Sequence, residues 1–458
     1  MRCRGGLLLV LACAACGSEG AEPTNVPAGP LHAIAADPQR GGDADLGYWA
    51  LVNENYVSCG IPLTAYEKAF APAPESERLP GREGKNAELP YHQTAIQTPS
   101  GVQAVTQNCL TCHAGRIDGQ LVLGLGAADS DFTSDQTKLV GLAGAFLSDP
   151  AEIAELERFV DRVKVIGPYT QTASVGVNPA DNLAAILFAH RDPETFEWHD
   201  PPLLQPPPEI VVPVDVPPWW HMNKKHAMFY VAAGRGDHAR TMMAASTLCT
   251  DDVIEAREID GYMPDIYAYL RTLEAPPYPF PVDTELAEQG RELFERTCST
   301  CHGSYGDPET YPNLWIELDY VGTDGTLALG ASQFADRFLA WFAESFYGEV
   351  SRLEPQVGYV APPLDGIWAT APYFHNGSVP TVEALLDSTR RPAIWTRSFE
   401  STDYDQSALG WNHTALDAPA GIMSYDTSRL GYGNGGHTFG DALSDEERRA
   451  IIEYLKTL

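Results

Sequence analysis

Apolar side chains recur at helical spacing in several separate stretches of the chain. Residues 150–164 show this most clearly, because Ile153, Leu156, Phe159, Val160 and Val163 fall on one face of a helix. Near the C-terminus, Ser444 followed by Glu447 is a capping box, which marks the start of a helix. The pattern predicts helices over residues 150–164, 180–188, 260–274, 284–297 and 444–458, with shorter ones near 47–52 and 65–70.

Long stretches rich in proline and glycine separate these helices. The chain has 36 prolines and 40 glycines, and the run from Pro201 to Pro218 is too rigid for a helix or a central strand. Residues 275–281 have the composition of a stiff linker and indicate a domain boundary. We therefore predict a mainly α-helical fold with long irregular loops and few, short strands.

The first residues indicate export. A short basic start is followed by an apolar run that is too short to span a membrane. The run ends at Cys16 in a sequence that resembles a bacterial lipoprotein processing site, although Cys13 stands where leucine is usual. We expect residues 1–16 to be a signal or lipoprotein leader and 17–45 a flexible tether. The protein would then be periplasmic or anchored to the outer membrane through lipidated Cys16.

The net charge of the chain limits the kinds of molecule that it is expected to bind. The formal net charge is −32, which argues against nucleic-acid binding because that function needs a basic face. The excess of acid fits a small redox protein with a basic patch as a partner, and equally fits a simple role in solubility.

Two copies of one short motif carry the candidate chemistry. Cys298, Cys301 and His302 form a Cys-x-x-Cys-His run, and Cys109, Cys112 and His113 repeat it. This motif is typical of covalent haem c attachment, in which both thiols bind the haem and the histidine ligates its iron. A zinc half-site or a redox dithiol is the alternative for each copy. The repetition favours two covalently bound haem c groups.

Each half of the chain has the same plan, with a haem motif near its start and an apolar-striped helix at its end. That is the order of a cytochrome c domain. We expect two cytochrome c-like haem domains, over residues 46–280 and 281–458.

Two cysteines remain after the leader and the motifs are set aside. Cys59 and Cys249 would form a disulfide in an oxidising compartment. Two unrelated buried thiols are the alternative.

Several further segments resemble a known family. They are residues 290–294, residues 358–381 with the block Ala-Pro-Tyr-Phe-His-Asn-Gly-Ser, the pair Trp219-Trp220 before Gly-Arg-Gly-Asp, and residues 435–440. Together with the haem motifs they resemble the bacterial dihaem cytochrome c peroxidase superfamily, closest to its rubber-oxygenase-like branch. The resemblance covers residues 45–458, and the chain is shorter than the rubber-cleaving members.

The resemblance implies that the two haems have different tasks. In the superfamily the C-terminal haem relays electrons, and its sixth ligand lies in a loop before the last helix. Here that loop holds His437, so the resemblance suggests iron ligation by His302 and His437, against the alternative of a surface histidine. His375 would hydrogen-bond a haem propionate or an iron ligand. His413 lies in no family motif.

The N-terminal haem is then the site at which O₂ or H₂O₂ reacts. Peroxidases of the superfamily carry a distal histidine soon after the first motif, whereas this chain has no histidine between His113 and His190. Without a base to move protons the peroxide reaction is handicapped, and an apolar roof of Leu121, Val122, Leu123 and Leu125 would suit O₂ binding. His221, His226 or His238 could still supply the base.

The segment around the tryptophan pair suggests supporting residues. Trp219 or Trp220 would shorten the electron path between the haems, or simply fill the core. Arg235, together with Lys224, Lys225 and Arg240, would neutralise haem propionates, although the two lysines would equally suit a solvated surface.

These observations predict an exported dihaem c-type oxidoreductase. Its partners would be O₂ or H₂O₂ and either a small redox protein or an apolar organic substrate. A dihaem electron carrier without a catalytic haem is the alternative. No acidic loop in the sequence supports a calcium site.

Overall fold

The computed structural model describes residues 29–333 and 335–458, and the predicted leader 1–16 lies outside them. The helices are α1 (Ala44–Asn53), α2 (Leu63–Ala69), α3 (Leu110–His113), α4 (Thr137–Gly141), α5 (Pro150–Ile166), α6 (Ala180–Ala189), α7 (His238–Thr241), α8 (Val253–Asp260), α9 (Met263–Leu270), α10 (Thr284–Thr297), α11 (Ser299–His302), α12 (Leu318–Val321), α13 (Thr326–Gln333), α14 (Ala335–Glu344), α15 (Val382–Leu386) and α16 (Asp445–Leu455).

The strands are all short. They are β1 (Leu31–Ala33), β2 (Ile61–Pro62), β3 (Gln93–Gln97), β4 (Gln103–Gln107), β5 (Ala114–Ile117), β6 (Gln120–Leu123), β7 (Gly234–Gly236), β8 (Leu314–Glu317), β9 (Ser351–Leu353), β10 (Gly358–Val360), β11 (Ile394–Arg397), β12 (Tyr404–Asp405), β13 (Gly410–Trp411), β14 (His413–Ala415) and β15 (Ser424–Asp426).

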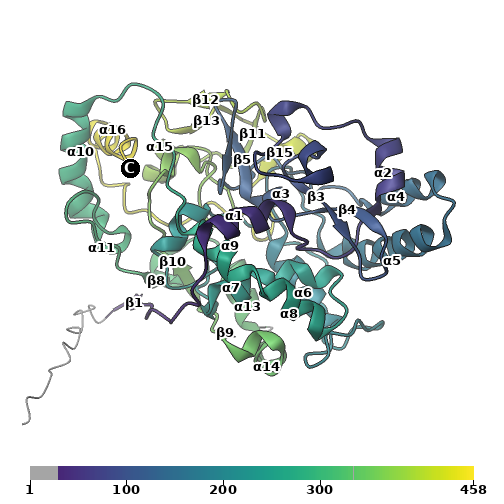
Figure 1. Ribbon diagram of the computed structural model, residues 1–458. Helices are drawn as coiled ribbons and strands as arrows, with labels where there is room; N and C mark the ends of the chain where they lie inside the picture. The colour runs from purple at the N-terminus through teal and green to yellow at the C-terminus, as the bar shows by residue number, and fades with distance from the viewer. Residues whose placement is uncertain (1–28, 334) are drawn as a thin grey trace, which may run out of the picture.

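The long helices form where the apolar pattern predicts them. The Asp149 side chain accepts hydrogen bonds from two backbone N–H groups at the start of α5, and Ser444 and Glu447 form the predicted capping box of α16. Helices α10 and α16 cross closely at one end of the molecule (Figure 1). Gly290 allows this contact, because a Cβ there would lie 1.9 Å from the carbonyl oxygen of Ala450.

The prediction of a mainly α-helical fold, however, underestimates the β-structure. The described residues form six small sheets of two or three strands, so the fold is mixed, with helices and scattered β-structure. The strands are short, as predicted, but they are not few. A strand of two to five residues contains too few positions to show an alternating pattern, and for this reason the hydrophobic periodicity did not reveal them.

The two predicted domains interleave rather than meet at residue 281. Strand β1 near the N-terminus pairs with β8, and β7 pairs with β9. Helix α14 also joins the core of the N-terminal part, where Trp341 stacks on Phe188 with 4.5 Å between ring centroids. The Trp341 indole donates a hydrogen bond to the carbonyl oxygen of Arg191. Residues 314–353 therefore help to build the N-terminal core.

Residues 29–45 are not a free tether. His32 stacks on Trp315 with 4.1 Å between ring centroids, and the Arg40 guanidinium forms ion pairs with Asp237 and Asp260 at 2.8 and 2.7 Å. Paired, partly buried charges hold this segment against the domain. Residues 17–28 of the predicted tether lie outside the described residues.

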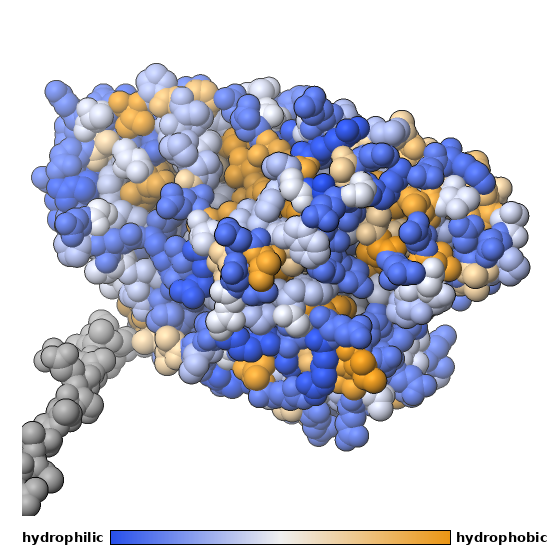
Figure 2. All heavy atoms as spheres, viewed as in Figure 1, coloured by the Kyte–Doolittle hydropathy of each residue, from blue (hydrophilic) through white to orange (hydrophobic). Residues whose placement is uncertain are grey.

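The surface is largely hydrophilic. On the face shown in Figure 2, polar residues predominate and apolar residues gather in separate patches. Among the described residues, no helix has the length and apolar character needed to cross a bilayer.

The predicted disulfide is confirmed. Cys59 and Cys249 are bonded across 190 residues of sequence, with 5.7 Å between their Cα atoms, and both side chains are fully buried. The bond ties the segment after α1 to the turn before α8.

We expect the double variant C59A/C249A to lose about 2–5 kcal/mol of unfolding free energy, because a native cross-link over a long loop restricts the unfolded chain. Denaturant titration of the oxidised wild type and the variant measures the difference. The reduced wild-type protein is the control and should match the variant. A variant as stable as the oxidised wild type would contradict the prediction.

Candidate functional site

The first motif lies in a tight turn between β4 and β5. The Asn108 side chain accepts a hydrogen bond from the Leu110 backbone N–H at 2.9 Å and so begins the turn of α3. The Cys112 sulfur accepts a hydrogen bond from the Asn178 amide at 3.1 Å. Cys109 is the N-cap of this four-residue helix and Cys112 lies within it, so the two thiols are about one helical turn apart, as attachment to a single flat group requires.

The His113 ring lies against Trp219, with 4.5 Å between ring centroids and 17° between ring planes. Its Nδ1 atom is buried and has no hydrogen-bond partner among the described residues. Burial lowers the pKa of His113 to about 4, so the imidazole is neutral at physiological pH. A neutral imidazole is the form that ligates metal ions.

A large cavity opens beside this histidine. Its volume is about 960 Å³, at the upper end of the usual range for ligand sites. Cys109, Cys112 and His113 line it together with Trp219. Most of the remaining wall is apolar and comes from α6, α13, α14 and the segment before α8; it includes Leu183, Phe188, Met242, Leu327, Phe338 and Phe342. Among the described residues, His113 is the only histidine on the wall.

The cavity wall differs from the predicted roof. Residues 121–125 do not line the cavity. They belong to the β5–β6 hairpin and the turn after it, where Leu121 and Leu123 pack toward one core and Leu125 toward the other. The apolar surface around the site comes from helices distant in sequence, which the local pattern after His113 does not indicate.

The carboxyl and amino side chains of the wall are Asp181, Asp215, Asp324 and Lys225. Desolvation raises the pKa of Asp181 to about 6 and lowers the pKa of Lys225 to about 8. Both side chains are half-buried, since they face the cavity. Lys225 is the only one of the four predicted propionate partners that lines the cavity.

The other three cations are held by protein groups. Lys224 forms ion pairs with Glu309 and Asp365. Arg240 is bound to Asp260 at 2.9 Å. Arg235 donates to the carbonyl oxygen of Ala35 at 2.7 Å.

The second motif follows α10 and lies at the opposite end of the interleaved core. His302 Nδ1 is 2.8 Å from the carbonyl oxygen of Pro362, a contact that orients the ring and leaves its other nitrogen free. The ring of His437 faces it, with 6.3 Å between ring centroids. Imidazole–metal bonds are about 2 Å long, so this spacing accommodates one metal ion between the two rings.

Backbone contacts hold His437 in place. Its N–H donates to the carbonyl oxygen of Val321 at 2.6 Å, and the Arg391 guanidinium donates to the carbonyl oxygens of Gly436 and His437. Gly436 is required for this packing, because a Cβ there would lie 2.1 Å from the Gly322 carbonyl carbon. Burial, with His302 nearby, lowers the pKa of His437 to about 3 and keeps it neutral.

The two tryptophans face different sites. Trp219 stacks on His113, whereas the Trp220 indole donates to the carbonyl oxygen of Asp365 at 2.8 Å. Asp365 follows closely after Pro362, the partner of His302. Two consecutive side chains thus extend from one motif toward the other.

The remaining predicted histidines lie away from the cavity wall. His238 is buried beside the Tyr267 hydroxyl at 3.1 Å, and His375 stacks on Tyr359 with 4.1 Å between ring centroids. His221 and His226 contact the backbone carbonyls of Asp365 and Ile34. His413 lies on the exposed strand β14.

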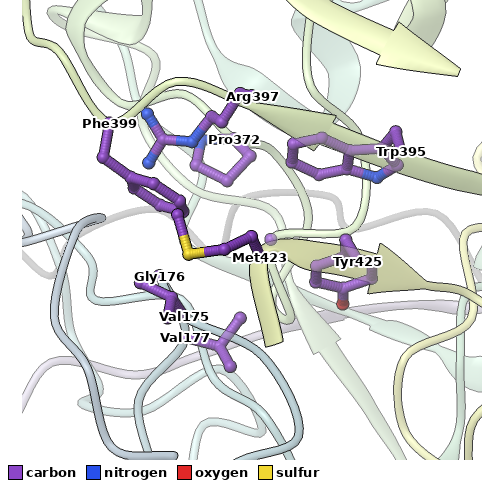
Figure 3. A pocket seen from close by; sticks show the side chains of 10 residues that line it. Val175, Gly176, Val177, Pro372, Trp395, Arg397, Phe399, Met423 and Tyr425 are labelled. Carbon is purple, nitrogen blue, oxygen red and sulfur yellow. The ribbon is translucent and has the colours of Figure 1, made fainter. Parts of the chain in front are cut away.

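A second, much smaller hollow lies where the two halves meet. Its volume is about 10 Å³, enough for one water molecule. Figure 3 shows Arg397 beside Phe399 at this point, with Trp395 and Tyr425 on the opposite side. The Arg397 guanidinium donates to the carbonyl oxygen of Ala128, so its role is to fasten the loop after the first motif.

Sequence reasoning missed most of the cavity wall. Phe338 and Phe342 carry an ordinary helical apolar pattern, which predicts burial but not which space they enclose. Asp181 and Asp215 lie in segments without a recognisable motif.

Comparison with known proteins supports haem binding. Residues 358–396 match the model of a family described as RoxA-like, cytochrome c-like. Over 282 residues, 47% of the chain, it is 29% identical to the uncharacterised protein y4iJ of Sinorhizobium fredii (strain NBRC 101917 / NGR234) and spans 46% of that protein. Over 326 residues, 60% of the chain, it is 26% identical to the uncharacterised protein y4iM of the same strain and spans 71% of it.

The cytochrome c-like match implies that the protein binds haem c and has a haem-dependent redox function. The side chains present fit this cofactor, because each motif offers two thiols and a neutral, half-buried histidine. The match itself covers His375 and ends at Thr396, and so contains neither motif.

We expect the variant H437A to convert a low-spin ferric haem signal into a high-spin one, because the iron loses an axial imidazole. Electron paramagnetic resonance of the purified holoprotein measures the change. H413A, which removes an exposed histidine of the same half, is the matched control and should leave the spectrum unchanged. An unchanged H437A spectrum would refute the ligand assignment.

Proposed function

We propose that the protein is an exported dihaem c-type oxidoreductase. One haem would be held by Cys109, Cys112 and His113 and react with O₂ or H₂O₂. The other would be held by Cys298 and Cys301, with His302 and His437 as axial ligands, and relay electrons. The observation that carries the proposal is the difference between the two histidines of the motifs: His302 faces a second imidazole, whereas among the described residues no second histidine lines the cavity beside His113.

The difference determines what each site can do. An iron with two imidazole ligands has no free position and suits electron transfer. An iron held by His113, with no second histidine among the described residues of the cavity wall, would keep a position for a reactant, and the polarity of the wall would then decide the chemistry. When bound, haem c supplies the redox chemistry. The protein holds its thiols and histidines, shields the site from water and shapes the access route.

The access route favours an apolar organic substrate. Ile210, Leu329 and Leu430 line the cavity and are also exposed, at 59%, 44% and 60%. Phe229 lines it as well and is 37% exposed. An apolar wall that continues to an exposed apolar rim offers an entering hydrocarbon chain contact along its whole path.

A second contact surface fits a small redox protein. Phe439 meets the His437 ring edge-on, with 5.0 Å between centroids, and packs against Tyr320. Both outer side chains are exposed, at 43% and 50%. Asp319 and Asp441 lie beside them in sequence and are exposed, so a partner with a basic patch would find complementary charge. Export, with or without lipid on Cys16, would bring the protein to such partners.

The oxidised protein should show one high-spin and one low-spin ferric haem, and the variant C109A/C112A should lose the high-spin signal with one haem equivalent. Electron paramagnetic resonance and a haem-to-protein ratio measure both. C298A/C301A is the converse control and should lose the low-spin signal. Two low-spin signals in the wild type would refute a reactive haem and leave the electron carrier.

Mixing the reduced protein with O₂ and, in a separate experiment, with H₂O₂ distinguishes an oxygenase from a peroxidase. The haem absorption of an oxygenase should change faster with O₂, and that of a peroxidase should change faster with H₂O₂.

The tryptophan pair should carry electrons between the sites. We expect W220F to slow electron transfer from the low-spin to the high-spin haem, since it removes the indole that lies beside the second motif. Stopped-flow absorbance after partial reduction measures the rate. W395F, an indole outside the path, is the control. An unchanged W220F rate would contradict a path through this side chain.

A further inference from the structure

Asp215 is a cavity-lining acid without a charged partner. Asp215 lines the cavity that His113 also lines, and among the described residues its carboxylate accepts a side-chain hydrogen bond from a tyrosine rather than from a cation. The Tyr230 hydroxyl donates to its Oδ2 atom over 3.4 Å, a long hydrogen bond. Its backbone N–H donates to the carbonyl oxygen of His375 at 2.7 Å, which fixes the position of the residue.

An acid in this setting is unusual. Carboxylates within apolar surroundings normally have cationic partners, because transfer of the charged form out of water is costly. Arg397 affects Asp215 only at a distance, and its guanidinium is bound to the carbonyl oxygen of Ala128 instead. Unpaired acids with displaced ionisation in a cleft are typical of functional sites.

The surroundings of Asp215 favour its neutral form. Desolvation raises its pKa well above the ordinary value, while the Tyr230 hydrogen bond, a backbone N–H and distant Arg397 oppose the shift. The other titratable groups close to it are Tyr373 and Tyr425, both buried, together with the neutral His375. Asp181 lies near Tyr230, and Asp181, Asp324 and Lys225 are the other charged side chains of the cavity wall.

We propose that Asp215, with Tyr230 behind it, is the proton-exchanging group of the cavity beside His113. This inference rests on the proposed function of that site. Asp215 would then take the place of the distal histidine that the sequence lacks, since a carboxyl group performs general acid–base catalysis as a histidine does.

The proton balance is closed within the cavity. As a carboxylate, Asp215 accepts the proton that H₂O₂ gives up, so that an O–H bond breaks and another forms on the carboxyl group. As a carboxylic acid, it donates this proton to the departing oxygen, which leaves as water with the electron pair of the broken O–O bond. The haem of the proposed function would hold the other oxygen atom and give up the two electrons that this atom requires. Asp215 ends in its starting state. Tyr230 holds the carboxyl group in place and gains or loses nothing.

Cyanide binding tests the proton step without turnover. Hydrogen cyanide is a neutral weak acid that must lose its proton when it binds ferric haem. We expect the association rate of the wild-type holoprotein to rise with pH as Asp215 becomes a carboxylate. In D215N the rate should be lower, by about 10²–10⁴-fold, as for removal of a general base, and should lose this pH dependence. Stopped-flow absorbance measures both.

Matched variants separate a proton role from a structural one. E209Q neutralises an exposed acid next to the cavity-rim residue Ile210 and should bind cyanide like the wild type. D215E, which restores a carboxyl group, should recover part of the rate and its pH dependence. D181N should keep the pH dependence, and loss of that dependence in D181N alone would overturn the assignment to Asp215. Equal unfolding midpoints for wild type and D215N establish that the fold is intact.

The outcomes distinguish this inference from the proposed function. If the wild type binds cyanide and reacts with H₂O₂ but D215N does both at the same rate, the role of Asp215 is refuted and the reactive haem stands. If the wild type binds no cyanide and shows only low-spin haem, the proposed function fails, and the inference falls with it.

Discussion

The segment from Val214 to Trp220 joins the two haem motifs, and the arrangement of both sites depends on it. Its backbone pairs with Asn178, whose amide binds the Cys112 sulfur, and Trp219 then lies flat on the His113 ring. The next residue, Trp220, reaches the turn that orients His302. Two prolines precede the tryptophans and restrict the backbone, so the indoles are held by a stiff chain between the motifs.

This connection lets one chain hold two chemically different environments. On one side, the rings of His302 and His437 face each other. The close packing of Gly436 and the hydrogen bond from Arg391 to its carbonyl oxygen fix the backbone next to His437. On the other side, His113 opens onto a wide apolar cavity with an acidic group in its wall. Under the proposed function, the same motif would support electron relay at one site and reactant binding at the other, depending on what faces its histidine.

Much of the fold could be predicted from local patterns. The helices at residues 150–166 and 284–297 and the capping box at Ser444 follow from apolar spacing and from local hydrogen bonding. The small sheets and the interleaving of the halves could not be predicted, because short strands carry no clear period and pair with partners remote in sequence. Strand β1 with β8 is the clearest case.

The sequence by itself identified the two Cys-x-x-Cys-His motifs as candidate haem-attachment sites, since such a motif is local, and it indicated the Cys59–Cys249 pair by elimination. Only the tertiary structure decided the surroundings of each motif. It removed residues 121–125 from the cavity wall, put Phe338 and Phe342 in their place, and placed Asp215 on that wall with Tyr230 as its side-chain partner. A cavity is enclosed by side chains from distant segments, and their meeting depends on long-range packing that no local pattern records.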